Sequence, residues 1–129
     1  MKEKHLNIVL LEDISFDELI PKLEKLFDHS LLYKNEKGRL IARCNTDDFK
    51  LEVIDKYDDL DESLCDDHYT IKFTITHTMP LDYEETENKI KEKFKNNIKW
   101  EYAIWSPVEK GEPYRRIYPE KETELFYRN

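Results

Sequence analysis

Acidic side chains gather in one short stretch of the chain, residues 55–67, whose sequence is DKYDDLDESLCDD. Seven of its thirteen residues are acidic and one is lysine, so the stretch has a local charge of −6. Widening the window to residues 47–67 brings the charge to −8, which equals the net charge of the whole chain. The remaining 108 of the 129 residues therefore sum to zero, and the acidity of the protein is a local feature.

Carboxylates clustered in this way suit a cationic protein partner, because they speed its approach and pair with its Lys and Arg side chains. Tyrosines lie within and beside the stretch, and aromatic residues next to charge are typical of protein–protein hot spots. A surface that binds nucleic acid is itself cationic, so a nucleic-acid-binding protein fits the stretch best. We predict a partner-binding surface made of Asp55, Tyr57, Asp58, Asp59, Asp61, Glu62, Asp66, Asp67 and Tyr69.

Three other interpretations stay open. The acidic stretch also fits a solvated loop between two strands, whose charge prevents edge-to-edge sheet pairing. A second alternative is an adaptor or subunit that binds through an exposed aromatic patch around Trp105. A third is a small enzyme or metal-binding domain built on His77 and on Cys65 and His68, whose Cys-x-x-His spacing resembles half of a zinc site.

The sequence offers little for catalysis. It has no Gly-rich phosphate loop, no Gly-x-Ser-x-Gly elbow and no His-Glu-x-x-His motif, and it contains only two glycines. His77 fits a strand-end histidine bonded to a backbone carbonyl, and Cys44 fits a buried structural thiol. We therefore predict no catalytic residue, no metal site and no cofactor.

Composition indicates one globular domain over residues 1–129, since 39% of the residues are hydrophobic and 12% are aromatic. A net charge of −8 disfavours direct binding to nucleic acid or to an anionic membrane. The longest apolar run, residues 8–11, is too short to span a bilayer, and two cysteines fit a reducing compartment. We expect a soluble, cytoplasmic protein.

The spacing of apolar residues predicts the elements that position these groups. Strands are expected at 5–11, 30–34, 39–46, 49–54, 68–77, 99–106 and 114–118. One helix is expected over 17–28. Ser15 or Asp17 can cap its start, and Asp17 is favoured because Pro21 then lies within the first turn. A second helix begins at Asp82, where Asp82 and Glu85 make a capping pattern. In the strand at 99–106, alternation places Trp100 on the core face and Trp105 on the opposite face.

The resulting order is β-α-β-β-β-β-α-β-β. Runs of strands joined by short turns favour a largely antiparallel sheet with two helices packed on one face, which is an α+β fold.

A small, acidic, cysteine-poor α+β chain with the stretch DKYDDLDESLCDD, the neighbouring NTDD and the aromatic-rich KWEYAIWS resembles the immunity proteins of bacterial contact-dependent growth inhibition systems. The resemblance is one of overall character, because these families share no diagnostic motif. It implies a non-enzymatic inhibitor that binds the C-terminal toxin domain of a delivered effector, often a nuclease, and neutralises it. No functional residue can be transferred by alignment.

Overall fold

A computed structural model describes residues 2–36, 39–46, 49–56, 68–77 and 82–127. It confirms the α+β fold, and it adds an eighth short strand to the seven that the sequence predicts. The elements are β1 (Lys2–Leu10), α1 (Phe16–Phe27), β2 (Leu32–Glu36), β3 (Arg39–Asn45), β4 (Phe49–Ile54), β5 (Thr70–His77), α2 (Tyr83–Phe94), β6 (Trp100–Ser106), β7 (Tyr114–Ile117) and β8 (Glu124–Phe126).

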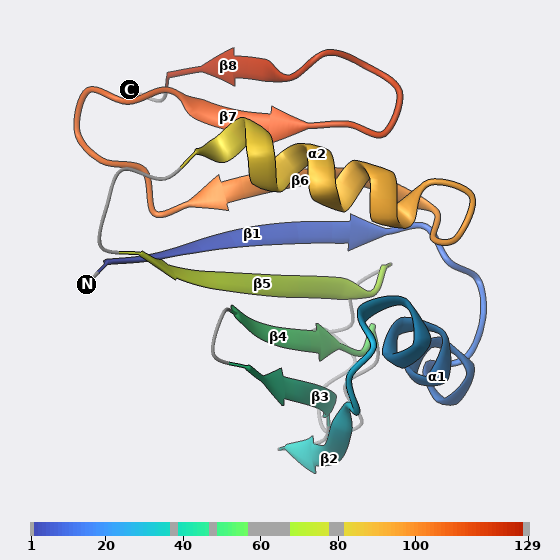
Figure 1. Cartoon of the computed structure of the whole chain (residues 1–129). Coiled ribbons are helices and arrows are strands. Elements are labelled where there is room, and N and C mark those ends of the chain that lie inside the picture. Colours follow the sequence, from blue (N-terminus) through green and yellow to red (C-terminus); the bar gives the residue numbers. More distant parts are fainter. Residues whose placement is uncertain (1, 37–38, 47–48, 57–67, 78–81, 128–129) are drawn as a thin grey trace.

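All eight strands belong to one sheet in the order β2-β3-β4-β5-β1-β6-β7-β8, and every neighbouring pair is antiparallel. The first strand therefore lies in the middle of the sheet, as its apolar character predicts. The chain crosses by α1 to the far edge, returns strand by strand to β5, and crosses by α2 to β6 (Figure 1).

Both helices lie on one face of the sheet, as predicted (Figure 1). Alternate side chains of the central strands point toward them and form the core, among them Leu6, Ile8 and Ile71, which are fully buried. Aromatic rings join the two layers: Phe27 of α1 lies 6.4 Å from Phe73 of β5, measured between ring centroids.

The first helix begins earlier than predicted. Ser15, and not Asp17, is the N-cap: its hydroxyl accepts from the Glu18 amide over 3.2 Å, and the Glu18 carboxylate accepts from the Ser15 amide over 3.4 Å. This reciprocal capping box satisfies two backbone donors at once, which explains why it prevails over Asp17. At the second helix the predicted N-cap is confirmed, since Asp82 accepts from the Glu85 amide over 3.1 Å.

The prediction for the aromatic strand β6 is wrong in one respect. Leu10 pairs with Trp100, but the preceding Val9 pairs with Tyr102, so Glu101 is an extra residue in the ladder. This bulge reverses the alternation, and Trp105 faces the core with 2% of its surface exposed. An exposed aromatic patch centred on Trp105, as the adaptor interpretation requires, is therefore not present.

Neither of the helices in the described part of the chain has the length and hydrophobicity that crossing a bilayer requires.

Candidate functional site

The acidic stretch connects β4 to β5, two neighbouring antiparallel strands. Asp55 follows β4, is 8% exposed, and donates its backbone amide to the carbonyl of Leu40 over 3.0 Å. Tyr69 precedes β5, is 3% exposed, and donates its hydroxyl to the carbonyl of Ile14 over 2.7 Å. Both ends of the connection are therefore fixed to the core.

The predicted partner-binding set divides into two groups. Asp55 and Tyr69 lie inside the fold, and the Tyr69 ring packs beside Phe16 with 6.1 Å between the centroids. An anchoring role for Tyr69 does not fit this structure, because the ring and the hydroxyl are both used within the core. The other members lie outside the described residues, and their role stays a prediction: Tyr57, Asp58, Asp59, Asp61, Glu62, Asp66 and Asp67.

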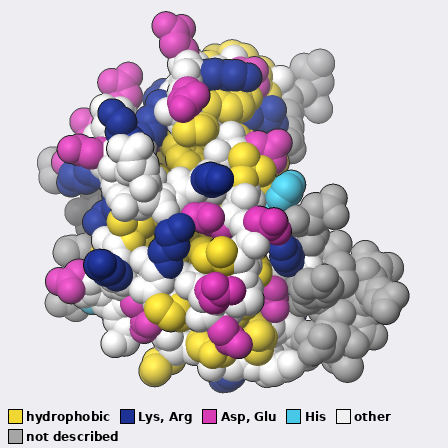
Figure 2. Space-filling view, turned by 90° about the vertical axis from the view of Figure 1, so that its right-hand side faces the viewer, with side chains coloured by type: hydrophobic (Ala, Val, Ile, Leu, Met, Phe, Trp, Pro, Cys, Tyr) yellow, Lys and Arg dark blue, Asp and Glu magenta, His cyan; other side chains and the backbone are white. Residues whose placement is uncertain are grey.

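A groove with a volume of ≈ 1150 Å³ lies between α1, the C-terminal end of α2 and the beginning of β6. Apolar side chains form part of its lining; Phe94 and Trp100 belong to the core, whereas Leu11 is 45% exposed. Most of the remaining lining is polar or charged. It consists of three glutamates, three asparagines and four lysines, namely Lys22, Lys91, Lys95 and Lys99. Figure 2 faces this end of the molecule, where charged side chains of both signs surround small hydrophobic patches.

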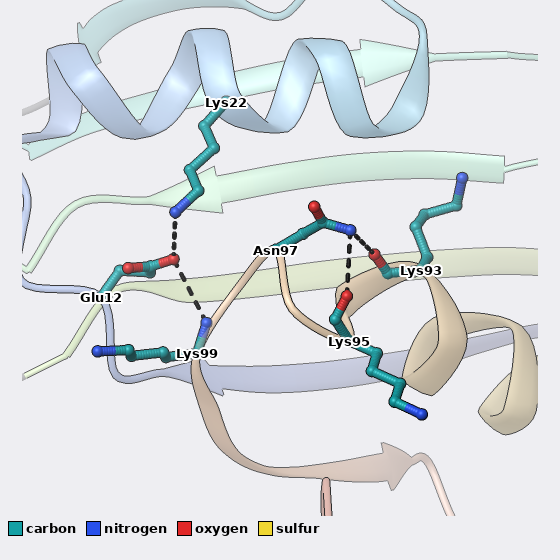
Figure 3. Close-up of polar contacts among 6 residues, drawn as sticks. All are labelled: Glu12, Lys22, Lys93, Lys95, Asn97 and Lys99. Carbon is teal, nitrogen blue, oxygen red and sulfur yellow. Dashed lines mark hydrogen bonds and ion pairs between the residues drawn. The ribbon is translucent and has the colours of Figure 1, made fainter.

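Glu12 holds two walls of the groove together. Its carboxylate, 8% exposed, accepts from the ammonium group of Lys22 over 2.8 Å and from the backbone amide of Lys99 over 3.3 Å (Figure 3). Lys22 comes from α1 and Lys99 from the segment before β6. Glu12 and Lys22 therefore neutralise each other within the groove, and their ion pair stabilises the fold.

The turn after α2 is fixed by its own hydrogen bonds. Asn96 adopts a left-handed conformation with φ 64°, which asparagine tolerates better than most residues. The Asn97 side-chain amide donates to the carbonyls of Lys93 over 3.0 Å and Lys95 over 3.2 Å (Figure 3). Backbone carbonyls that the helix leaves unpaired are thereby satisfied, and the lysines of this turn stand on a fixed backbone.

Three lysines of the groove keep their charge unpaired. Within the described ranges, the ammonium groups of Lys91, Lys95 and Lys99 have no ion-pair or hydrogen-bond partner. Cations near a helix C-terminus interact favourably with its dipole, which gives Lys91 and Lys95 a structural reason to be there. Lys99 lies beyond the helix and has no such reason.

The groove and the residue at which the acidic stretch enters β5 lie on either side of the end of β1. Leu10 donates its amide to the carbonyl of Tyr69 over 2.9 Å, and Leu11 donates to the carbonyl of Lys99 over 2.8 Å. The chain thus enters β5 from the acidic stretch on one side of β1 and enters β6 from the groove on the other. One end of the sheet brings together an unpaired basic cluster and both fixed ends of the acidic stretch.

A buried carboxylate that sequence reasoning missed lies on the inner face of α2. Glu87 is 2% exposed and accepts three hydrogen bonds of 2.8 Å, one from the Trp105 indole and two from the Arg115 guanidinium. The bond to Glu87 raises the pKa of Arg115. Because it is buried and bonded to Trp105 and Arg115, the carboxylate ties α2 to β6 and β7. No spacing rule in the sequence pairs residue 87 with residue 115.

The other predicted chemical groups do not converge in the described residues. Cys44 is buried, as expected, and burial raises the pKa of its thiol. His77 ends β5, but its side chain and the whole of Cys65 lie outside the description. His68 lies 3.9 Å from the carboxylate of Glu101. Among the described residues, no three His, Cys, Asp or Glu side chains come close enough to hold a metal ion.

Comparison of the chain with protein-family models, with curated proteins and with solved structures found no match. Its function is therefore inferred from its own charges and geometry.

Proposed function

We propose that this chain is a non-enzymatic inhibitor that binds and neutralises a basic partner through its acidic stretch. The partner we propose is a toxin domain, of the nuclease class, and the site of action is the cytoplasm. One observation carries the proposal: residues 55–67 hold a charge of −6, whereas the chain outside 47–67 is neutral. A protein that needed acidity only for solubility would have no reason to concentrate it.

The way the stretch joins the fold supports this function. It connects β4 to β5, two neighbouring strands inside the sheet. The residues at its two ends, Asp55 and Tyr69, are buried and hydrogen-bonded. A segment with fixed ends loses less conformational freedom on binding than a free tail does, so the entropy cost of binding is smaller. The fold thus supplies a rigid base from which the carboxylates can meet a partner.

The chemistry of the stretch favours a nuclease over other basic proteins. An enzyme that cleaves nucleic acid must present cationic side chains to the phosphates of its substrate. Carboxylates that pair with those side chains compete with the substrate for the same surface. Inhibition then needs no catalytic group on this chain, which agrees with the resemblance to immunity proteins.

An affinity isolation from the native host at low salt tests the proposal. The tagged parent is compared with an Asp58→Asn/Asp59→Asn/Asp61→Asn variant, and bound proteins are identified by mass spectrometry. A matched control changes net charge equally at exposed positions elsewhere: Glu3→Gln/Asp13→Asn/Glu122→Gln. We expect one basic protein with the parent and with the control, and its loss with the stretch variant.

The captured partner is then assayed for cleavage of RNA and DNA with and without the chain. Suppression by the parent, and not by the stretch variant, is the expected result. Equal recovery and equal suppression by all three proteins would show that the acidic stretch is not the interface.

A further inference from the structure

We infer that the groove beside α2 is a docking site for an acidic, amphipathic peptide segment of a partner protein. The inference depends only on described residues of the groove, and it stands whether or not the acidic stretch binds a basic partner.

The charge of the groove selects the sign of its ligand. Glu12 neutralises Lys22 at 2.8 Å, and among the described residues the ammonium groups of Lys91, Lys95 and Lys99, which also line the groove, have no ion-pair partner. Lys91 and Lys95 are four residues apart at the end of α2 and repel one another, and an anionic ligand would relieve this repulsion. The remaining lining holds these three lysines against two glutamates, Glu92 and Glu120, which is an excess of one positive charge.

With a volume of ≈ 1150 Å³, the groove can hold a peptide segment, and its lining suits one. In its apolar lining, Phe94 and Trp100 are buried, and the side chain of Leu11, which is 45% exposed, can be covered by a ligand. Apolar contact beside charged side chains is usual in protein–protein interfaces, where the apolar groups anchor and the charges orient.

Two carboxylates argue against nucleic acid as the occupant. Glu92 and Glu120 also line the groove, and neither is paired with a lysine of the described chain. A continuous phosphate backbone would bring negative charge against both of them. A peptide can place a carboxylate beside each lysine and leave neutral groups beside Glu92 and Glu120. The Asn88 and Asn96 side chains can hydrogen-bond its backbone.

The backbone of the groove is suited to docking, because its basic turn is already ordered. The bonds from Asn97 to the carbonyls of Lys93 and Lys95 hold the turn, and the Glu12 bond to the Lys99 amide holds its far end. A site that is formed before binding has less ordering entropy to lose.

The test uses fluorescent twelve-residue probes at low salt: a peptide of alternating Glu-Glu and Leu-Leu pairs, the same peptide with lysine in place of glutamate, and a single-stranded RNA of twelve nucleotides. Binding is measured by fluorescence anisotropy, and the site is mapped by backbone-amide NMR shifts. We expect the acidic peptide to bind, to shift the amides of Asn96, Asn97 and Lys99, and to bind more tightly than either other probe.

Two variants locate the contact. Lys91→Gln/Lys95→Gln/Lys99→Gln should weaken the acidic peptide about tenfold, the sum of three surface charge pairs. A matched control, Lys25→Gln/Lys34→Gln/Lys110→Gln, should weaken it by less than about threefold, through net charge alone. Leu11→Ser removes one exposed anchor without any change of charge and should also weaken binding, with the circular dichroism spectrum unchanged.

Absence of binding by the acidic peptide would overturn the inference. So would equal losses in the groove variant and its control, amide shifts elsewhere on the molecule, or tighter binding of the RNA at the same amides.

Discussion

The two halves of α2 use charge in opposite ways. In the first half, the Glu87 carboxylate is buried and accepts three short hydrogen bonds from Trp105 and Arg115. In the last turn and just after it, Lys91 and Lys95 keep their ammonium groups unpaired within the described part of the chain. The buried, paired carboxylate of Glu87 stabilises the fold, whereas the ammonium groups of Lys91 and Lys95 are available to a partner. The difference can be tested one substitution at a time.

The largest effect should come from Glu87→Ala. Removing the carboxylate leaves the Arg115 guanidinium and the Trp105 indole without their partner in a buried site, which costs about 3–5 kcal/mol of unfolding free energy. Urea unfolding followed by tryptophan fluorescence measures the loss. The matched control is Glu85→Ala on the same helix, whose exposed pair with Lys89 at 3.1 Å should be worth only ~0.3–0.5 kcal/mol. Similar losses in both variants would mean that the buried pair does not hold the sheet and helix together.

Trp105→Phe should have a smaller effect of the same kind. It keeps an aromatic ring in the core but removes the N–H that donates to Glu87. Trp100→Phe is the control, since its indole has no hydrogen-bond partner in the described ranges and both side chains are buried. We expect Trp105→Phe to lose about 1–2 kcal/mol more than Trp100→Phe in the same urea titration. A greater loss at Trp100 would show that packing outweighs the bond.

Glu12→Ala should lower the unfolding free energy by less than Glu87→Ala and by more than the loss of the groove lysines. The Glu12 carboxylate is buried, but it lies in the groove. Loss of its bonds to Lys22 and to the Lys99 amide should lower the unfolding free energy by about 1–2 kcal/mol. Glu92→Ala, another glutamate of the groove, should change it by less than ~0.5 kcal/mol. Amide hydrogen exchange at Lys99 should accelerate in the first variant alone; unchanged exchange would contradict the bridging role of Glu12.

The smallest effect on stability should come from Lys91→Gln/Lys95→Gln/Lys99→Gln. Because these charges have no side-chain partner in the described fold and Lys91 and Lys95 interact only with the dipole of α2, the thermal midpoint should fall by no more than about 3 °C. Differential scanning calorimetry measures it. A larger drop would mean that the lysines serve the fold beyond this dipole interaction and would weaken the functional distinction between the two halves of α2.

Local patterns in the sequence were enough to predict the fold class and most elements. Alternation identified β5, helical spacing identified both helices, and the cap at Asp82 followed from the Asp82 and Glu85 capping pattern. The N-cap of α1 was misassigned because Pro21 was expected within the first turn, whereas the structure places it inside the helix. The observed N-cap depends on the reciprocal hydrogen bonds between Glu18 and Ser15, which residue types alone do not reveal.

The sites were harder to predict, because they depend on contacts between distant segments. Glu101 is an extra residue in β6, so the residues that follow it point to the opposite side from the one that strict alternation predicts. Trp105 was therefore placed on the wrong face. The Glu87–Arg115 pair spans 28 residues, and the groove combines residues near positions 11, 95 and 120. The acidic stretch was visible in the sequence because its signal is its local composition.

The most direct test of the central proposal is the salt dependence of the association rate between this chain and its captured partner. We expect the rate of the parent to fall steeply as sodium chloride rises from about 20 to 300 mM, because electrostatic steering is screened. In the Asp58→Asn/Asp59→Asn/Asp61→Asn variant, the rate at low salt should be lower and the slope shallower. Identical rates and slopes for the parent and the variant would contradict a binding role for the acidic stretch.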